Sequence, residues 1–152
     1  MLKPILLVED DARDLELTMI ALERSGLAND VVVVRDGEQA LNYLRRQGDF
    51  ASRPEGNPAF VILDLKLPKI TGHEVLDQVR QSPELRAMPV VILTSSHEEP
   101  DVLRGYQLGV NAYVVKPVDF TQLVHTVSEL GMFWGVLNEP PPGSARVKRK
   151  HG

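Results

Sequence analysis

The 152-residue sequence contains no cysteine. Disulfide bonds and thiolate metal sites are therefore excluded, and burial of apolar side chains has to stabilise the fold. The sequence also lacks any apolar run near the roughly 20 residues that a membrane-spanning helix needs, and its N-terminus does not follow the pattern of a signal peptide. We therefore expect a cytoplasmic protein without a membrane segment.

Length and charge limit the kind of protein further. A chain of 152 residues that is 43% hydrophobic fits one globular domain. Its formal net charge is −4, and removing the four positive charges of the tail leaves −8 over residues 1–145 (Arg146, Lys148, Arg149 and Lys150). An acidic domain is poorly suited to bind a nucleic-acid backbone on its own. We interpret the basic tail as a solvated end, with weak contact to an acidic partner or nucleic acid as the alternative.

Five short apolar runs alternate with amphipathic stretches along the chain. This alternation is typical of an α/β fold in which helices cover a parallel sheet. The runs are continuous and rich in β-branched residues, as expected for strands that are buried on both faces. The predicted strands are residues 5–8, 31–34, 60–63, 90–93 and 113–115.

Short polar residues mark the predicted helix starts, and glycines mark the helix ends. In a capping box, the first side chain accepts a hydrogen bond from the helix and an acid or amide three residues later reaches back. The candidate pairs are Asp36 with Gln39, Thr71 with Glu74, Ser96 with Glu99, and Asp119 with Gln122. A glycine accepts the left-handed closing conformation most easily, and the predicted closing residues are Gly26, Gly48 and Gly109.

Polar residues follow four of the predicted strands. In an open parallel sheet, ligands bind beyond the carboxyl ends of the strands, where the strand order reverses. We therefore expect the polar residues at these strand ends to meet at one edge: the acids of residues 9–11, Asp64, Thr94 and Lys116. Asp10 or Asp11 could instead be a simple helix cap, and Lys116 a surface ion pair.

These residue types suit phosphoryl transfer to a carboxylate. Asp64 is the candidate nucleophile, because a carboxylate oxygen can form an acyl phosphate. A hard cation such as Mg²⁺ offsets the repulsion between two anions, and Asp10 with Asp64 could bind it directly, with Glu9 acting through water. Lys116 supplies a compact positive charge, and the Thr94 hydroxyl supplies a hydrogen-bond donor.

Four segments together resemble the receiver domain of two-component response regulators, and the resemblance covers roughly residues 3–130. The segments are ILLVEDD at 5–11, DLKLPKITG at 64–72, VVILTSS at 90–96 and YVVKP at 113–117. The resemblance implies a doubly wound, flavodoxin-like sheet of five parallel strands in the order 2-1-3-4-5. It also implies a signalling phosphoacceptor that catalyses its own phosphorylation, with a sensor histidine kinase as partner and no DNA-binding domain.

The resemblance assigns a role to each matching residue. The metal, Mg²⁺ or Mn²⁺, would be held by Glu9, Asp10, Asp64 and the backbone carbonyl of Lys66. Phosphorylation would occur on Asp64 with the help of Lys116 and Thr94. Thr94 and Tyr113 would form the conformational switch, and the Lys116–Pro117 peptide would be cis.

Two segments exceed a minimal receiver domain: a polar loop at 48–58 and an apolar stretch at 131–137 that contains Trp134. They also look like a subgroup of single-domain regulators associated with bacterial phytochrome histidine kinases, in which a C-terminal extension helps to build a homodimer. We predict a receiver domain at 1–130, an apolar extension of the last helix at 131–139 and a Pro-rich, then basic tail at 140–152. The alternative is a last helix that simply lies on its own sheet.

Three other functions remain open at this point. A Mg²⁺-dependent phosphatase with an aspartate nucleophile would carry D-x-D-x-T directly after the first strand, and that run is missing. A scaffold with only the receiver shape would not need the acids and the lysine. A flavodoxin-like nucleotide-binding protein would carry a glycine-rich loop after the first strand, which is also missing.

Overall fold

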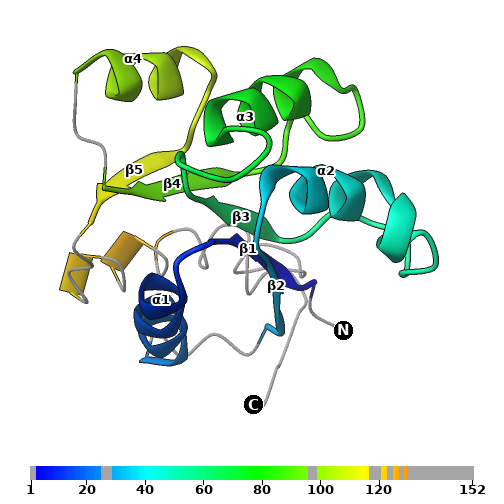
Figure 1. Cartoon of the computed structure of the whole chain (residues 1–152), viewed down its shortest axis with the longest axis horizontal. Helices are drawn as coiled ribbons and strands as arrows, with labels where there is room; N and C mark the ends of the chain where they lie inside the picture. The colour runs from blue at the N-terminus through cyan, green and yellow to red at the C-terminus, as the bar shows by residue number, and fades with distance from the viewer. Residues whose placement is uncertain are drawn as a thin grey trace, which may run out of the picture.

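The computed structural model describes residues 3–24, 29–95, 99–116, 121–122, 125–126 and 129. Five parallel strands form one sheet in the order β2-β1-β3-β4-β5, which confirms the predicted order (Figure 1). Two strands are each longer than predicted by one residue, at the carboxyl end of β4 and the amino end of β5. The strands are β1 (Ile5–Val8), β2 (Val31–Val34), β3 (Phe60–Leu63), β4 (Val90–Thr94) and β5 (Ala112–Val115).

The helices form a layer on each face of this sheet. Helix α1 lies on one face, and α2, α3 and α4 lie on the other (Figure 1). The described residues between 121 and 129 are helical as well. The helices are α1 (Ala12–Arg24), α2 (Gly37–Arg45), α3 (Gly72–Gln81) and α4 (Glu99–Gln107), with a short 3-10 helix, η1 (Gly48–Phe50), after α2.

The alternating side chains of β1 show how both faces are buried. Leu6 and Val8 belong to the apolar cluster under α2 and α3, whereas Ile5 and Leu7 belong to the cluster under α1. All four side chains have no solvent exposure. A continuous apolar run is therefore what this strand position requires, because successive side chains point to opposite faces and both faces are covered.

Strand register brings the polar strand ends to one edge. Val8 pairs with Val34 on one side and with Leu63 on the other, and Thr94 pairs with Val115. The residues that follow these strands consequently leave the sheet side by side, which is the arrangement that the candidate site needs.

The predicted helix starts are confirmed where the structure describes them. Thr71 and Glu74 form a complete capping box. Asp36 accepts a hydrogen bond of 2.7 Å from the backbone N–H of Gln39, but the Gln39 side chain accepts from the N–H of Arg35 instead of reaching Asp36. The pairs that begin at Ser96 and Asp119 lie outside the described residues.

The predicted closing glycines are confirmed at one position and wrong at another. Gly109, with φ +82°, follows the end of α4. Helix α2 does not run to Gly48. It ends at Arg45, and Arg46 adopts the left-handed conformation with φ 55°, so that its N–H bonds to the carbonyls of Asn42 and Tyr43. Gly48, also left-handed, opens η1 instead, and Gly26 lies outside the described residues.

Several other predictions fall outside the described residues. They are the Lys116–Pro117 peptide, the apolar extension at 131–139 with Trp134, and the tail at 140–152. Among the described helices, none is long and apolar enough to cross a membrane.

Candidate functional site

One ammonium group lies among three carboxylates at the carboxyl edge of the sheet. The Nζ atom of Lys116 is 2.9 Å from Oε1 of Glu9, 2.8 Å from Oδ2 of Asp14 and 3.2 Å from Oδ2 of Asp64. The side chains of Lys116 and Asp64 are each 8% exposed, and that of Glu9 is 1% exposed. Residues from the ends of β1, β3 and β5 and from the first turn of α1 thus share one desolvated cluster.

Backbone hydrogen bonds at the strand ends fix where these side chains begin. The N–H of Glu9 donates to the carbonyl of Val34, and the N–H of Asp64 donates to the carbonyl of Val8, both at 3.1 Å. The N–H of Lys116 donates to the carbonyl of Thr94 at 2.7 Å. Each functional residue is therefore the first one beyond its strand, still tied to the neighbouring strand.

Asp64 is held on both of its carboxylate oxygens. Oδ2 faces the Lys116 ammonium, and Oδ1 accepts a hydrogen bond of 3.2 Å from the backbone N–H of Lys66. The start of α3 crosses close behind Asp64, because a Cβ atom on Gly72 would lie 2.3 Å from the Asp64 carbonyl oxygen. Only glycine fits there without a shift of the backbone, so Gly72 sets how closely the loop after Asp64 folds back.

Glu9 is the most deeply buried acid of the cluster. Desolvation on burial, together with the nearby charge of Asp64, raises the pKa of Glu9 to about 7, although the hydrogen bond from Lys116 acts in the opposite direction. Its Oε2 atom accepts a hydrogen bond of 3.1 Å from the N–H of Asp11. The charged form of Glu9 is therefore costly unless further positive charge enters the cluster.

Lys116 stays protonated in this setting. Burial acts to lower the pKa of Lys116, but the hydrogen bonds to Asp14 and Glu9 and the charge of Asp64 outweigh it, so the pKa lies above the usual value. When all three carboxylates are ionised, one ammonium leaves a deficit of two positive charges. Carboxylate oxygens are the ligands that Mg²⁺ and Mn²⁺ prefer, so the donor set and its charge fit a divalent cation.

The Lys116 cluster contains Asp14, which was not predicted. It does not contain the carboxylate of Asp10, which was predicted. Asp10 is exposed, and its backbone carbonyl accepts a hydrogen bond of 2.8 Å from Arg35. Its carboxylate makes no hydrogen bond or ion pair with the described residues. Asp11 caps α1, because its Oδ1 atom accepts from the N–H groups of Arg13 and Asp14 at 2.9 Å each. Sequence reasoning missed Asp14, although an acid in the first turn of the helix after β1 is a usable signal.

The remaining predicted residues lie on β4, on β5 and in the loop after β3. Thr94 is fully buried at the end of β4. Tyr113 on β5 is half-buried and its ring centroid is 6.3 Å from that of Tyr106 on α4. Lys66, two residues after Asp64, is exposed. Thr94 therefore lies at the same edge as Asp64 and Lys116, whereas Tyr113 lies further back along β5, paired with Ile92 of β4.

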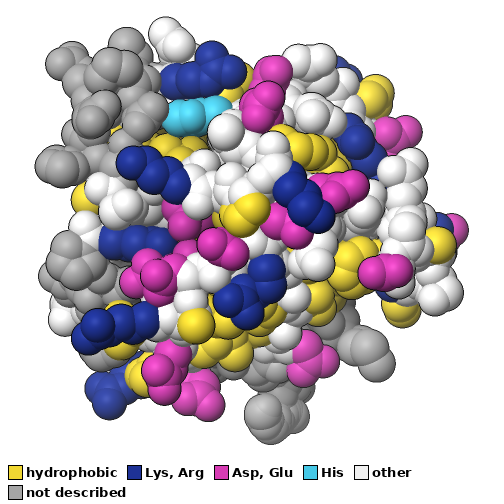
Figure 2. All heavy atoms as spheres, viewed as in Figure 1, with side chains coloured by type: hydrophobic (Ala, Val, Ile, Leu, Met, Phe, Trp, Pro, Cys, Tyr) yellow, Lys and Arg dark blue, Asp and Glu magenta, His cyan; other side chains and the backbone are white. Residues whose placement is uncertain are grey.

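Basic and acidic side chains alternate on the surface near this edge. Lys69, after β3, lies 3.1 Å from a carboxylate oxygen of Glu38 and 3.7 Å from one of Asp36. Figure 2 shows the two signs of charge interspersed across one face of the molecule. Within that view of the described residues there is no continuous basic patch of the kind that binds a nucleic-acid backbone.

Comparisons with known proteins agree with this geometry. The chain matches the model of the response regulator receiver domain over residues 5–128. The probable methanogenesis regulatory protein FilR2 of Methanothrix harundinacea is 45% identical over 138 residues, which cover 90% of this chain and 86% of that protein.

Two solved structures are similar over nearly the whole chain. The bacteriophytochrome response regulator RtBRR is 70% identical with a TM-score of 0.81, covering 95% of this chain and 87% of that one. The Mn²⁺-bound form of the response regulator Rcp1 is 38% identical with a TM-score of 0.76, covering 92% of this chain and 99% of that one.

Proposed function

The chain belongs to the response regulator receiver domain family, and from this premise we propose that it accepts a phosphoryl group on the carboxylate of Asp64. The resemblance predicted from four sequence segments is thereby confirmed, including the likeness to bacteriophytochrome response regulators. A phosphatase is not favoured, because the match is to a signalling phosphoacceptor and not to a hydrolase.

The observation that carries the proposal is the position of Asp64 beside Lys116. Asp64 is 6% exposed, follows the central strand β3 and has an ammonium group 3.2 Å from one oxygen. In the proposed step, an oxygen of Asp64 forms a bond to phosphorus while the bond from phosphorus to a donor imidazole nitrogen breaks. The electron pair of that bond stays on the imidazole.

We assign the divalent cation to Asp10, Asp64 and the backbone carbonyl of Lys66, with Glu9 acting through water. When bound, the cation offsets the repulsion between the carboxylate and the phosphoryl oxygens. The Mn²⁺-bound form of Rcp1, a 38% identical protein, supports this choice of metal.

In the described part of the chain, however, no three acidic or histidine side chains are arranged around a point that a metal ion could occupy. The Lys116 ammonium lies between the carboxylates of Glu9, Asp14 and Asp64 instead. We therefore propose that the Lys116 ammonium leaves Glu9 and Asp14 when the cation binds, and that it then holds the transferred phosphoryl oxygens.

Thr94 and Tyr113 complete the proposed switch. Thr94 lies at the end of β4, and the Lys116 backbone is bonded to its carbonyl. If the Thr94 hydroxyl turns towards the newly added phosphoryl oxygens, it leaves space behind it. The ring of Tyr113 on the adjacent strand would then move into that space. Such a switch changes the surface of α4 and β5 and thereby the choice of partner. A scaffold without phosphorylation would not need the buried acid cluster that Lys116 links.

We propose a sensor histidine kinase as the phosphodonor, specifically a bacterial phytochrome, on the strength of the 70% identity to RtBRR. This phosphotransfer would occur in the cytoplasm, where such a kinase binds ATP. We also propose catalysis of phosphorylation by the chain itself when the donor is a small molecule. The apolar extension at 131–139 would join two copies into a homodimer.

Phosphotransfer from a purified, autophosphorylated bacterial phytochrome kinase tests this proposal. We expect the radioactive label to move from the kinase to the native chain in the presence of Mg²⁺ and not to Asp64→Asn. Labelling of the Asp64→Asn variant at the native rate would contradict the assignment.

A further inference from the structure

Arg80, in the last turn of α3, connects three segments of the chain through its guanidinium. Its Nη1 atom donates to the backbone carbonyls of Arg86 at 2.9 Å and Met88 at 2.8 Å, in the loop before β4. Its Nε atom donates to the carbonyl of Leu108 at 3.2 Å, and Nη2 donates to that of Gly109 at 2.7 Å, directly after α4. One side chain therefore ties together the carboxyl ends of α3 and α4, which lie on the same face of the sheet (Figure 1).

Neutral oxygens hold this guanidinium in place. Arg80 is half-buried, and burial lowers the pKa of its guanidinium from the ordinary value. Four carbonyl groups offset the cost of desolvation, because hydrogen bonds from a charged donor are about twice as strong as neutral ones. Carbonyl groups at a helix end lack partners within the helix, and Arg80 supplies partners to the two carbonyls that follow α4.

Gly109 and Asn111 complete the attachment of this helix end. Gly109 has φ +82°, and a Cβ atom there would lie 3.2 Å from Nε of Arg80, so glycine permits both the turn and the close approach. Asn111 exchanges two hydrogen bonds of 2.8 Å with the backbone of Val90, one through its N–H and one through Oδ1. The carboxyl end of α4 is therefore fixed to both α3 and β4.

Before this end, α4 contacts the sheet at Gly105. Of the α4 residues whose exposure the structure describes, only Gly105 is buried, and its neighbours Arg104 and Tyr106 are exposed. A Cβ atom on Gly105 would lie 3.5 Å from two ring carbons of Tyr113 and 3.3 Å from Cδ1 of Ile92. The Tyr113 ring therefore lies against the backbone of α4, about one turn before the anchored end.

We propose that Arg80 is a positioning residue, the fixed point on which α4 pivots when Asp64 is phosphorylated. This inference rests on the proposed function, in which the Tyr113 ring moves into the space behind Thr94. The ring then withdraws from Gly105, and the helix moves at that point. Its carboxyl end stays in place, because the four bonds of Arg80 are independent of the ring.

The geometry of the helix sets where this movement is largest. With a rise of about 1.5 Å per residue, Gly105 lies about 5 Å and Glu99 about 14 Å along the helix from Leu108. A pivot at Leu108 therefore moves Glu99 about three times as far as Gly105. The change of surface on phosphorylation is largest at the amino end of α4 and smallest beside Arg80.

Residual dipolar couplings of the full-length, ¹⁵N-labelled chain test the proposal, because they report how each N–H bond is oriented relative to the sheet. They are measured with Mg²⁺ alone and with Mg²⁺ and beryllium fluoride, which binds a carboxylate as a stable mimic of a phosphoryl group. In the native chain, the couplings of residues 99–107 should change together, as in a rotation, and those of residues 108–111 should keep their values. In Arg80→Gln, the couplings of residues 108–111 should change as well. Their amide hydrogen exchange in EDTA should be about tenfold faster or more, because bonds from a charged donor are lost.

Arg86→Gln is the matched control. It removes the charge of an exposed arginine and keeps the backbone carbonyl that Arg80 binds, so it should behave as the native chain does. Circular dichroism of each variant verifies the fold.

The outcomes separate this inference from the proposed function. If beryllium fluoride leaves the amide signal of Asp64 unchanged, the proposed function fails and the pivot fails with it. If that signal changes, three results would overturn the pivot alone: unchanged couplings in α4, equal changes at residues 99–107 and 108–111 of the native chain, or native behaviour of Arg80→Gln. The first two are measured on the native chain, so the test does not depend on the stability of the variant.

Discussion

The guanidinium of Arg35 donates a hydrogen bond of 2.8 Å to the backbone carbonyl oxygen of Asp10. Arg35 is the first residue after β2 and is itself fixed, because its N–H bonds to the side chain of Gln39 on α2. This contact joins the loop after β1 to the loop after β2. Asp10 is exposed, and its carboxylate is not part of the Lys116 cluster. The bond from Arg35 therefore helps to fix the backbone of this proposed metal ligand.

Arg35→Gln should therefore weaken Mn²⁺ binding by about three- to tenfold, the cost of losing one hydrogen bond that orders a ligand. Simple Coulomb repulsion predicts the opposite sign, because removing a positive charge near a cation site favours the cation. Isothermal titration calorimetry with Mn²⁺ distinguishes the two. Arg13→Gln, an exposed change at the start of α1, is the control and should leave affinity unchanged or slightly higher. Tighter binding by Arg35→Gln would rule out the positioning role.

Lys116→Met should make folding depend on divalent metal. Its removal leaves Glu9, Asp14 and Asp64 without their shared cation, and a buried charge without its partner costs about 3–5 kcal/mol. We expect a large loss of stability in EDTA during urea unfolding. Mg²⁺ should recover more stability in this variant than in the native chain, because it binds the folded acid cluster without competition from an ammonium. Equal recovery in both proteins would contradict the account.

The raised pKa of Glu9 predicts how the free energy of unfolding depends on pH in the absence of metal. The pKa of Glu9 in the folded state, about 7, lies above the ordinary value of 4.5 for this side chain, so the folded state binds this proton more tightly than the unfolded state. The contribution of this proton to the free energy of unfolding is fully present below pH 4.5 and is lost as the pH rises through 7. The loss is up to about 3 kcal/mol, at about 1.36 kcal/mol per pKa unit. Glu9→Gln should remove this dependence. Urea unfolding in EDTA at pH 4.5 and pH 8 should therefore show a smaller change for Glu9→Gln, and parallel pH curves would refute the prediction.

Removal of residues 131–152 should convert a dimer into a monomer without loss of the receiver fold. The segment 131–137 is apolar and contains Trp134, and such a segment favours burial against a second copy. Analytical ultracentrifugation of the full chain and of the shortened chain checks this. A shortened chain that still sediments as a dimer would show that the interface lies elsewhere.

Most of the fold and the centre of the site were predictable from the sequence. Continuous apolar runs identify buried parallel strands, and the residues directly after them, Glu9, Asp64 and Lys116, must then share an edge. Asp14 was not predicted, because its contact with Lys116 depends on how the first turn of α1 is rotated. That rotation follows from packing and from the Asp11 cap, and not from strand spacing.

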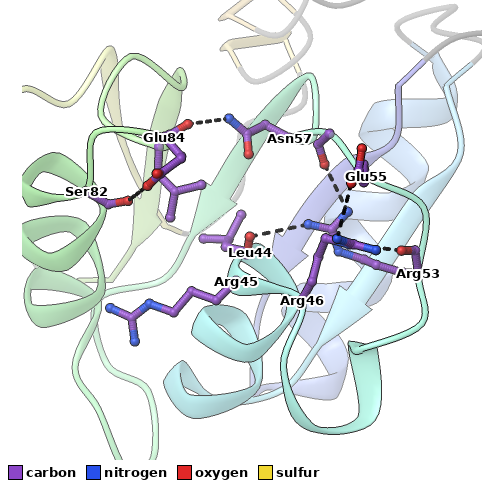
Figure 3. A pocket seen from close by; sticks show the side chains of 10 residues that line it. Leu44, Arg45, Arg46, Arg53, Glu55, Asn57, Ser82 and Glu84 are labelled. Atoms are coloured by element: carbon purple, nitrogen blue, oxygen red, sulfur yellow. Dashed lines mark hydrogen bonds and ion pairs between the residues drawn. The ribbon is translucent and has the colours of Figure 1, made fainter.

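The end of α2 shows a second limit of sequence reasoning. Gly48 has the left-handed geometry expected of a closing glycine, but Arg46 adopts it two residues earlier. The N–H of Arg46 closes the helix on the carbonyls of Asn42 and Tyr43, and its side chain bonds to the carbonyl of Arg53 in a loop whose course the sequence pattern does not define (Figure 3). The preference of glycine for the closing position therefore did not locate the end of α2, because a residue with a side chain closes it.

Intact-mass measurement after incubation with acetyl phosphate and Mg²⁺ tests the central claim most directly. The native chain should gain the mass of one phosphoryl group, and the gain should disappear in EDTA and in Asp64→Asn while circular dichroism shows that the variant is folded. A native chain that gains no mass, or an Asp64→Asn variant that gains it equally, would contradict the assignment of Asp64 as the phosphoacceptor.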